Sequence, residues 1–385
     1  MARFVLRRLL AGILTLWVVA SLSFLLMRLA PGGPFQRDKP LPPAVEANLR
    51  RTFGLAEDVA VTQPGTLVRF LVRPGQLVEK DAPLAEIRED QQQIVQQKAD
   101  RALRVIALTG QPGRVLHAGD ALLARETTAW QQYFQAMASY AQLNFGVTYA
   151  SEGSETVMAT LSRAFPVSLE LGFFALLLAL TLGVSAGLLA GLKPHSPLDH
   201  VTMTLALLAV SMSSIVLGPL LKLIFCVQLR WLDLGGWQPL ALDWPHLQVK
   251  ILPVVTLGLI YAAWFARLTR AGMLEVVRQD YVRTARAKGL PERVVVLRHA
   301  LRGAILPTVS FLGPALAGIV TGSTVIEQVF QVPGVGEFFV TSAVNRDYPM
   351  VMGTVVLYSS LLIVANLLVD VLQAALDPRV RGDHA

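Results

Sequence analysis

The segment Asp280-Tyr-Val-Arg-Thr-Ala-Arg-Ala-Lys-Gly-Leu290 lies in a basic stretch between two long apolar runs. Asp280 is a residue type that caps helix N-termini, and Gly289 stands where a short helix would end in a left-handed turn. Ala285 and Ala287 between them are small. The segment therefore predicts a short helix with a small, basic face and a defined end, a shape that can fit a groove on another protein. A basic loop that rests on lipid headgroups is the alternative interpretation.

The composition excludes an ordinary soluble domain. Of the 385 residues, 53% are hydrophobic and only 16% are charged, and the mean hydropathy is +0.51. A helix needs about 20 residues to cross a hydrocarbon core of about 30 Å. Six apolar runs approach or exceed this length, at residues 9–29, 165–192, 201–227, 251–265, 305–326 and 351–376. Because the alternating pattern of barrel strands is not seen, we predict an all-α polytopic membrane protein with six transmembrane helices.

Basic residues predict the orientation of these helices, because positively charged flanks stay in the cytoplasm. Arg7 and Arg8 precede the first run, further basic residues lie between the fourth and fifth runs, and Arg379 and Arg381 follow the sixth. Both termini are therefore expected to be cytoplasmic, and residues 31–163 external. The net charge of +7 then reflects this bias and contact with anionic lipid, so a nucleic-acid partner is not implied.

Several further segments carry a family pattern. They are Phe4-Val-Leu-Arg-Arg-Leu-Leu10, Phe311-Leu-Gly-Pro-Ala315, Pro333-Gly-Val-Gly336 and Asn345-Arg-Asp-Tyr-Pro349. With these and residues 280–290, the chain resembles the binding-protein-dependent ABC importer permeases of the dipeptide/oligopeptide branch, and within it the oligopeptide permease subunit most closely. The resemblance covers nearly all of the chain outside the first external loop, in which residues 59–126 are an extra segment relative to the family.

The resemblance implies an importer of peptides in a bacterial inner membrane that works by alternating access. Its other parts would be a homologous second permease subunit, two cytoplasmic ABC ATPases that bind ATP and Mg, and an extracytoplasmic solute-binding protein. The cytoplasmic loop at about residues 268–304 would couple this chain to the ATPases. The residues that the resemblance assigns to this contact are Asp280, Tyr281, Arg283, Thr284, Ala285, Arg286, Ala287, Lys288 and Gly289. Arg283-Thr-Ala285 stands where the general importer motif has Glu-Ala-Ala, so the contact would lack an acidic anchor.

The sequence contains no motif for catalysis in this chain. No Gly-x-x-x-x-Gly-Lys-(Ser/Thr) phosphate loop is present, and the six histidines lack metal-ligand spacing. Cys226 is the only cysteine. We therefore expect a transport subunit without a catalytic site, metal or cofactor of its own. An ion-coupled secondary transporter and a membrane enzyme are the alternative classes, and dipeptides, nickel, glutathione or cell-wall peptides are the alternative substrates within the importer class.

Residues 59–126 form an insert in the predicted external loop. Apolar residues alternate at strand period on both sides of Pro74-Gly75, and a weaker copy of the pattern follows at residues 105–123. The two halves resemble those of a biotinyl/lipoyl-like sandwich, while the Gln-rich stretch 89–103 between them is expected to be helical. A carrier would need a lysine on a tight hairpin between the halves, and only Lys98 lies there. We therefore favour a small docking or packing module.

Polar residues inside apolar runs are expensive in lipid and mark candidate sites. Asn366 and Asp370 lie one helical turn apart, and Glu327 lies at the predicted external end of the fifth run. We interpret all three as candidates for a substrate pathway or a subunit seam, with a helix-end hydrogen bond as the alternative for Asp370. Pro166 and Pro307 are expected near the starts of their helices, so Pro314, deeper in its run, is the candidate hinge. Residues 328–345, which follow Glu327, are expected to form a loop. The predicted domains are a first helix (1–30), the external loop (31–163) and the permease core (164–385).

Overall fold

The computed structural model describes residues 2–29, 50, 55–89, 93–109, 111–151, 154–233, 237–241 and 243–376. The chain divides into two compact units. The membrane unit comprises residues 1–20, 159–344 and 351–385, and the β unit comprises residues 21–158 and 345–350. Arg379 and Arg381, which served to orient the C-terminus, lie outside the described residues, as do residues 30–49 at the start of the predicted external loop.

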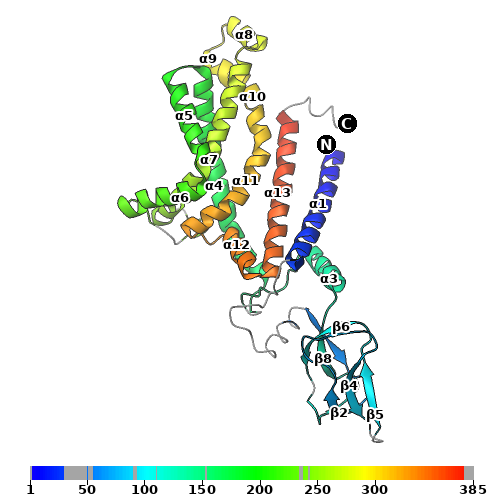
Figure 1. Ribbon diagram of the computed structural model, residues 1–385. Helices are drawn as coiled ribbons and strands as arrows, with labels where there is room; N and C mark the ends of the chain where they lie inside the picture. Colours follow the sequence, from blue (N-terminus) through cyan, green and yellow to red (C-terminus); the bar gives the residue numbers. More distant parts are fainter. Residues whose placement is uncertain are drawn as a thin grey trace. The chain divides into compact units, whose positions relative to one another are not determined.

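Five described helices are long and apolar enough to cross a membrane (Figure 1). They are α1 (Ala2–Leu29), α4 (Val157–Leu192), α7 (Trp244–Val276), α11 (Leu306–Phe330) and α13 (Tyr348–Leu376). These helices confirm five of the six predicted runs. Helix α7 is longer than its apolar run, since it begins at Trp244 and continues for eleven residues of mixed polarity beyond residue 265.

The third run was predicted as one continuous helix, and this is wrong. It consists of α5 (Pro197–Ser211), followed by α6 (Ser214–Lys222) and the π-helical segment η1 (Leu223–Gln228), and the pair is bent by 104°. Met212 and Ser213 adopt extended backbone conformations at the bend, and the Ser213 hydroxyl accepts a hydrogen bond from the Ile215 N–H. A serine cap thus starts a new helix inside an apolar run. Counted as one broken span, this pair brings the total to six.

Helix α7 is the centre of the membrane unit and packs against α5, α6, α10 (Leu301–Ala304) and α11. Helix α4 approaches it along one stripe of glycines, Gly183, Gly187 and Gly191. An ideal Cβ on Gly183 would lie 2.5 Å from the carbonyl oxygen of Ala262, so the two backbones are closer than any side chain permits. Such small-residue stripes are how helices associate closely in lipid.

Two ion pairs also join neighbours to α7. The Lys250 ammonium lies 2.7 Å from the Glu170 carboxylate of α4, and the two side chains are only 4% and 5% exposed. Lys250 also donates to the Ala241 carbonyl, and the Leu240 N–H donates to Glu170. At the start of α5, Asp199 accepts two hydrogen bonds from Arg270, at 2.5 and 2.8 Å. Both pairs went unpredicted, although an isolated carboxylate in an apolar run was a usable signal for Glu170.

Two smaller predictions in this unit need correction. Pro166 was expected near the start of its helix, but it lies inside α4, which begins nine residues earlier. Residues 328–345 were expected to form a loop, but α11 ends at Phe330 and the helix α12 (Val335–Asn345) follows. By contrast, Pro307 lies in the first turn of α11, where its missing N–H costs no helical hydrogen bond.

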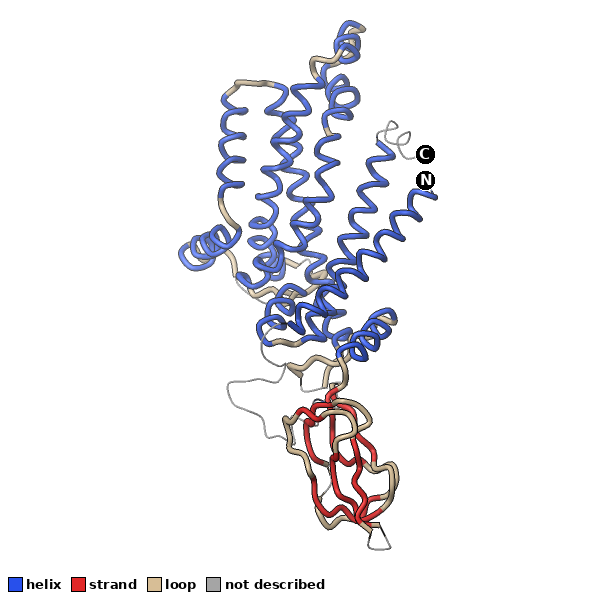
Figure 2. Tube along the Cα trace, turned by 45° about the vertical axis from the view of Figure 1, so that its right-hand side comes forward, coloured by secondary structure: helices blue, strands red, loops and turns tan. Residues whose placement is uncertain are grey.

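The β unit contains two four-stranded sheets (Figure 2). Their orders are β1-β8-β6-β3 and β5-β4-β2-β7. Shifting every strand number by four converts one order into the other, so the halves β1–β4 and β5–β8 are equivalent, as the repeated sequence pattern predicted. The strands are β1 (Ala56–Ala60), β2 (Gly65–Phe70), β3 (Leu77–Val78), β4 (Pro83–Arg88), β5 (Ile94–Lys98), β6 (Leu103–Leu108), β7 (Val115–Leu116) and β8 (Ala121–Glu126).

The core of the β unit lies between its two sheets, where Leu84 of one sheet packs with Val105 and Leu123 of the other. Gly75 and Gly113 occupy equivalent turns with φ values of +86° and +89°, which glycine adopts without strain. The helix expected at residues 89–103 is wrong, because β5 and the start of β6 occupy that stretch. Lys98 is the last residue of β5 and pairs with Pro83, so it is not on the β4–β5 turn.

The glycine stripe predicts that the stability of the membrane unit falls sharply when a stripe glycine gains a side chain. Gly187→Ala places a methyl group 2.8 Å from the Cβ of Thr269 and against the backbone of α7, and we expect a loss of about 1–3 kcal/mol from overpacking. Gly172→Ala on the same helix is the control, because its methyl group would meet only the Ile319 side chain at 3.4 Å. Thermal unfolding in detergent checks the difference, and equal stability of the two variants would contradict this packing.

The buried ion pair between Glu170 and Lys250 predicts that the stability losses of its single variants do not add up in the double variant. Lys250→Met leaves the Glu170 carboxylate buried without its cation and should cost about 3–5 kcal/mol, whereas the double variant Glu170→Gln/Lys250→Met should recover most of that loss. Unfolding midpoints of the two single variants and the double variant provide the measurement. Strictly additive losses would show that the two side chains do not interact.

Candidate functional site

Residues 280–287 form the helix α8 (Asp280–Ala287), and residues 277–279 separate it from the end of α7. Its N-cap is Gln279, whose N–H donates to the Val276 carbonyl at 3.0 Å. Asp280 was predicted as the cap but is the first helical residue. There its negative charge faces the positive end of the helix dipole. The chain then continues through α9 (Glu292–Val294) and the π-helical η2 (Val295–Ala300) into α10.

One face of α8 is buried within the membrane unit. Val282 is fully buried and Ala285 is 5% exposed. Both pack in a cluster with the end of α7, η2 and α10, formed by Met273, Val276, Val295, Ala300 and Ala304. The short helix is therefore fixed on a platform that continues two membrane helices. A larger side chain at Ala285 would lift it off this platform.

The opposite face of α8 is exposed and basic. Thr284 donates a hydrogen bond back to the Asp280 carbonyl at 2.9 Å, and Arg283 lies 3.6 Å from the Asp280 carboxylate. The Tyr281 hydroxyl lies beside Gly303 of α10, 3.0 Å from the position that a Cβ on this glycine would take. The exposed side chains of the site are Asp280, Tyr281, Arg283, Thr284, Arg286, Ala287 and Lys288. Eight of the nine residues assigned by resemblance thus reach the surface of α8 or its end, and Ala285 instead packs inward.

Glu292 is a further residue of this site, for which no role was predicted. Its carboxylate accepts two hydrogen bonds from Arg286, at 2.8 and 3.3 Å, and so ties the end of α8 to α9. The hydrogen bond from Arg286 lowers the pKa of Glu292, so the pair remains charged at neutral pH and is lost only as the pH falls through that lowered pKa. A spacing of six residues across a turn matches no helical pattern, so the sequence carried no signal for this contact.

Gly289 follows the Lys288 C-cap with φ at +75°, which confirms the predicted left-handed turn. A Cβ there would meet no atom within 4 Å. The backbone conformation, and not a lack of side-chain space, therefore favours glycine at this position.

The other candidate residues lie apart from α8. Glu327 is fully buried, and its carboxylate accepts a hydrogen bond of 2.7 Å from the Gly336 N–H at the start of α12. Asp370 pairs with Arg8 of α1 at 3.1 Å. Asn366 is exposed, and its amide oxygen lies 2.8 Å from the position of a Cβ on Gly313 of α11.

Glu327 and Asp370 each serve a contact between helices, and the structure does not bring Glu327, Asn366 and Asp370 together. Pro314 lies inside α11, where its role as a hinge stays a prediction. Within the part of the chain that the structure describes, no group of three or more His, Cys, Asp or Glu side chains could hold a metal ion.

The described structure is a bundle of apolar helices that carries a short, exposed helix on a platform at one end, which is the architecture expected of a membrane permease subunit. The chain belongs to the family of binding-protein-dependent transport system inner membrane components, whose model matches residues 179–382. It is thus a permease of the ABC importer type.

Full-length relatives agree with this assignment. The oligopeptide transport system permease protein OppB of Escherichia coli K12 is 37% identical over 99% of this chain and 100% of its own length. The dipeptide transport system permease protein DppB of Bacillus subtilis is 32% identical over 99% and 98%. A crystal structure of an amino acid ABC transporter with histidines covers 57% of this chain and 94% of its own, with 15% identity and a TM-score of 0.44.

The turn after α8 predicts a conformational requirement. Gly289→Val forces a β-branched residue into a left-handed backbone conformation and should cost about 1–3 kcal/mol locally. Gly289→Asn is the control, because asparagine tolerates this conformation. We expect the valine variant to insert into the membrane but to lose ATP-driven uptake in the assembled transporter, and the asparagine variant to retain it. Normal uptake by Gly289→Val would contradict a coupling role for this turn.

Proposed function

We propose that this chain is the transmembrane permease subunit of an ATP-driven, binding-protein-dependent importer of oligopeptides. The observation that carries the proposal is α8, a short helix with a buried anchor face and an exposed basic face, in a chain that matches an oligopeptide transport permease along its whole length. The relative from the dipeptide system supports the same branch at lower identity.

The proposed partners are a homologous second permease subunit, two cytoplasmic ABC ATPases and an extracytoplasmic solute-binding protein, all embedded in or next to a bacterial inner membrane. ATP and Mg would bind the ATPases, and this chain would hydrolyse nothing. The exposed side chains of α8 would enter a groove on one ATPase. Arg286 is already paired with Glu292. The basic residues of this face best able to contact acidic groups in the ATPase groove are therefore Arg283 and Lys288.

The mechanism we infer is alternating access. Closure of the ATPases on ATP would displace α8, and the buried contacts of Val282 and Ala285 would pass that displacement to α7 and α10. The cavity between the two permease subunits would then open outward to receive peptide from the binding protein. ATP acts here by stabilising one of two packings, which requires contacts that differ between them. Pro314 would allow α11 to bend between the two states.

We infer that the β unit has a lipoyl-like fold without a carrier role. Its two equivalent halves and paired sheets support that fold. The sequence between β4 and β5, residues 89–93, contains no lysine, and Lys98 lies at the far end of β5. A docking or packing role for the β unit fits this arrangement.

Uptake by the transporter reconstituted in vesicles tests the proposed function. With ATP inside and the binding protein outside, we expect uptake of a labelled oligopeptide to be competed by unlabelled oligopeptides, and less by dipeptides, glutathione or nickel. Competition by only one of these alternatives would identify that compound as the substrate and would leave the importer class unchanged. Uptake that needs an ion gradient and no ATP would overturn the class itself.

The proposed orientation predicts a labelling pattern. In a Cys226→Ser background, a cysteine at the exposed Gln238 should react with an impermeant thiol reagent added outside the cell, whereas one at the exposed Gln279 should not. Both sites replace a glutamine, so the side-chain change is matched. The reverse pattern would invert the membrane topology and exclude α8 from contact with cytoplasmic ATPases.

A further inference from the structure

Four aromatic rings form one cluster where α1 meets α3 (Ala129–Ala141) in the β unit. Tyr133 is at its centre, with ring centroids 5.6 Å from Phe24, 6.3 Å from Trp130 and 5.4 Å from Phe134. Trp130 and Phe134 stack on each other at 6.3 Å. Because these two residues are four apart, they share one face of α3.

The outer rings of this cluster face away from the protein. Trp130 is 72% exposed and Phe134 is 65% exposed. The last turns of α1 continue the same apolar surface with further exposed side chains, which are Leu22, Leu25, Leu26 and Leu29. The aromatic pair thus extends a surface that belongs to a membrane-spanning helix, at the end of that span.

Polar contacts fix α3 at this position. The hydroxyls of Tyr133 and Ser21 are 2.8 Å apart, and Arg28 donates a hydrogen bond to the Gln132 amide oxygen. Helix α3 is therefore tied to both ends of the last two turns of α1 and cannot move away from the end of the span while these contacts hold.

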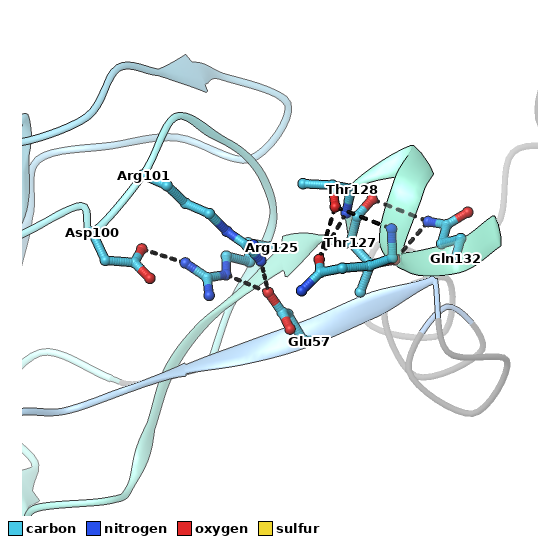
Figure 3. Close-up of polar contacts among 8 residues, drawn as sticks. Glu57, Asp100, Arg101, Arg125, Thr127, Thr128 and Gln132 are labelled. Atoms are coloured by element: carbon cyan, nitrogen blue, oxygen red, sulfur yellow. Dashed lines mark hydrogen bonds and ion pairs between the residues drawn. The ribbon is translucent and has the colours of Figure 1, made fainter. Parts of the chain in front are cut away.

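The other side of α3 is joined directly to the sheets. Strand β8 ends at Glu126, and the Gln132 amide donates to the Thr127 carbonyl at 3.1 Å and to its hydroxyl at 2.5 Å (Figure 3). Thr128 caps α3. Near the end of β8, Arg125 donates a hydrogen bond of 2.8 Å to Glu57 of the neighbouring strand β1. The helix connects the sheets to α1 without a flexible linker.

We infer that α3 is an interfacial helix that inserts Trp130 and Phe134 into the lipid at the end of α1 and so anchors the β unit to the membrane surface. Tryptophan and tyrosine concentrate at the level of the lipid headgroups, where an aromatic ring meets apolar chains and its polar atom meets water. Interfacial helices bury their apolar face about 5–10 Å into the boundary between headgroups and acyl chains. Helix α3 contains no charged residue, so this contact needs no anionic lipid.

Lipid fits this surface better than a protein partner because the surface lies beside the exposed leucines at the end of α1, a helix long and apolar enough to span a membrane. The inference concerns only where α3 lies, and it holds whichever substrate the transporter imports.

Fluorescence quenching in nanodiscs tests this inference. In a Cys226→Ser background, the full-length chain carries a bimane label at Phe134→Cys or, as the control on the other face of α3, at Gln135→Cys, which is also exposed. We expect lipids with a nitroxide near the headgroup to quench the label at position 134 several-fold more strongly than the label at position 135. Iodide in the buffer should show the opposite order. The result should be the same in phosphatidylcholine alone and with added phosphatidylglycerol.

Three outcomes would overturn the inference. Equal quenching of both labels by the nitroxide lipid would show that α3 has no membrane-facing side. Strong quenching of position 134 by iodide alone would leave this face in water, and protection of position 134 from both quenchers would show that protein covers it. Trp130→Cys supplies the same readout if Phe134→Cys does not elute as a single species in detergent.

Discussion

Helix α7 can occupy the centre of the membrane unit only because its neighbours meet it at glycine. The stripe of Gly183, Gly187 and Gly191 brings α4 against the α7 backbone, and Gly272 of α7 does the same for the Ala304 backbone of α10. No hydrophobic effect draws helices together inside lipid, so close van der Waals contact must supply the attraction. The two buried ion pairs then set the position of α7 along its neighbours, since a slip of α7 would separate Lys250 from Glu170 and Arg270 from Asp199.

This packing explains how a short surface helix can act on a whole bundle. Only residues 277–279 separate α7 from α8, and the cluster around Val282 joins α8 to η2 and α10 as well. A displacement of α8 would therefore move α7 directly and would move α11 through α10, because no long loop separates these helices from α8. At the C-terminal end of α8, the Arg286–Glu292 pair and the left-handed turn at Gly289 join this helix to α9.

Features set by local sequence were predicted well. Apolar runs located the spanning helices, period-two alternation located the β insert and its two halves, and one glycine located the end of α8. Predictions failed where a distant contact or a cap decides the outcome. Ser213 starts a new helix inside an apolar run, and the stretch containing Lys98 is drawn into strands by pairing with β4. The partner of Glu170 lies 80 residues away, a distance over which no sequence period operates.

If α8 transmits force through its buried face, the number of peptides imported per ATP hydrolysed should depend on the side chains of that face. Val282→Ala removes two methyl groups from the fully buried contact, while Val294→Ala makes the same chemical change at a valine that is 37% exposed in α9. The account predicts that Val282→Ala lowers this ratio while the ATPases remain bound, and that Val294→Ala leaves it unchanged. An unaltered ratio in a stable Val282→Ala transporter would contradict it.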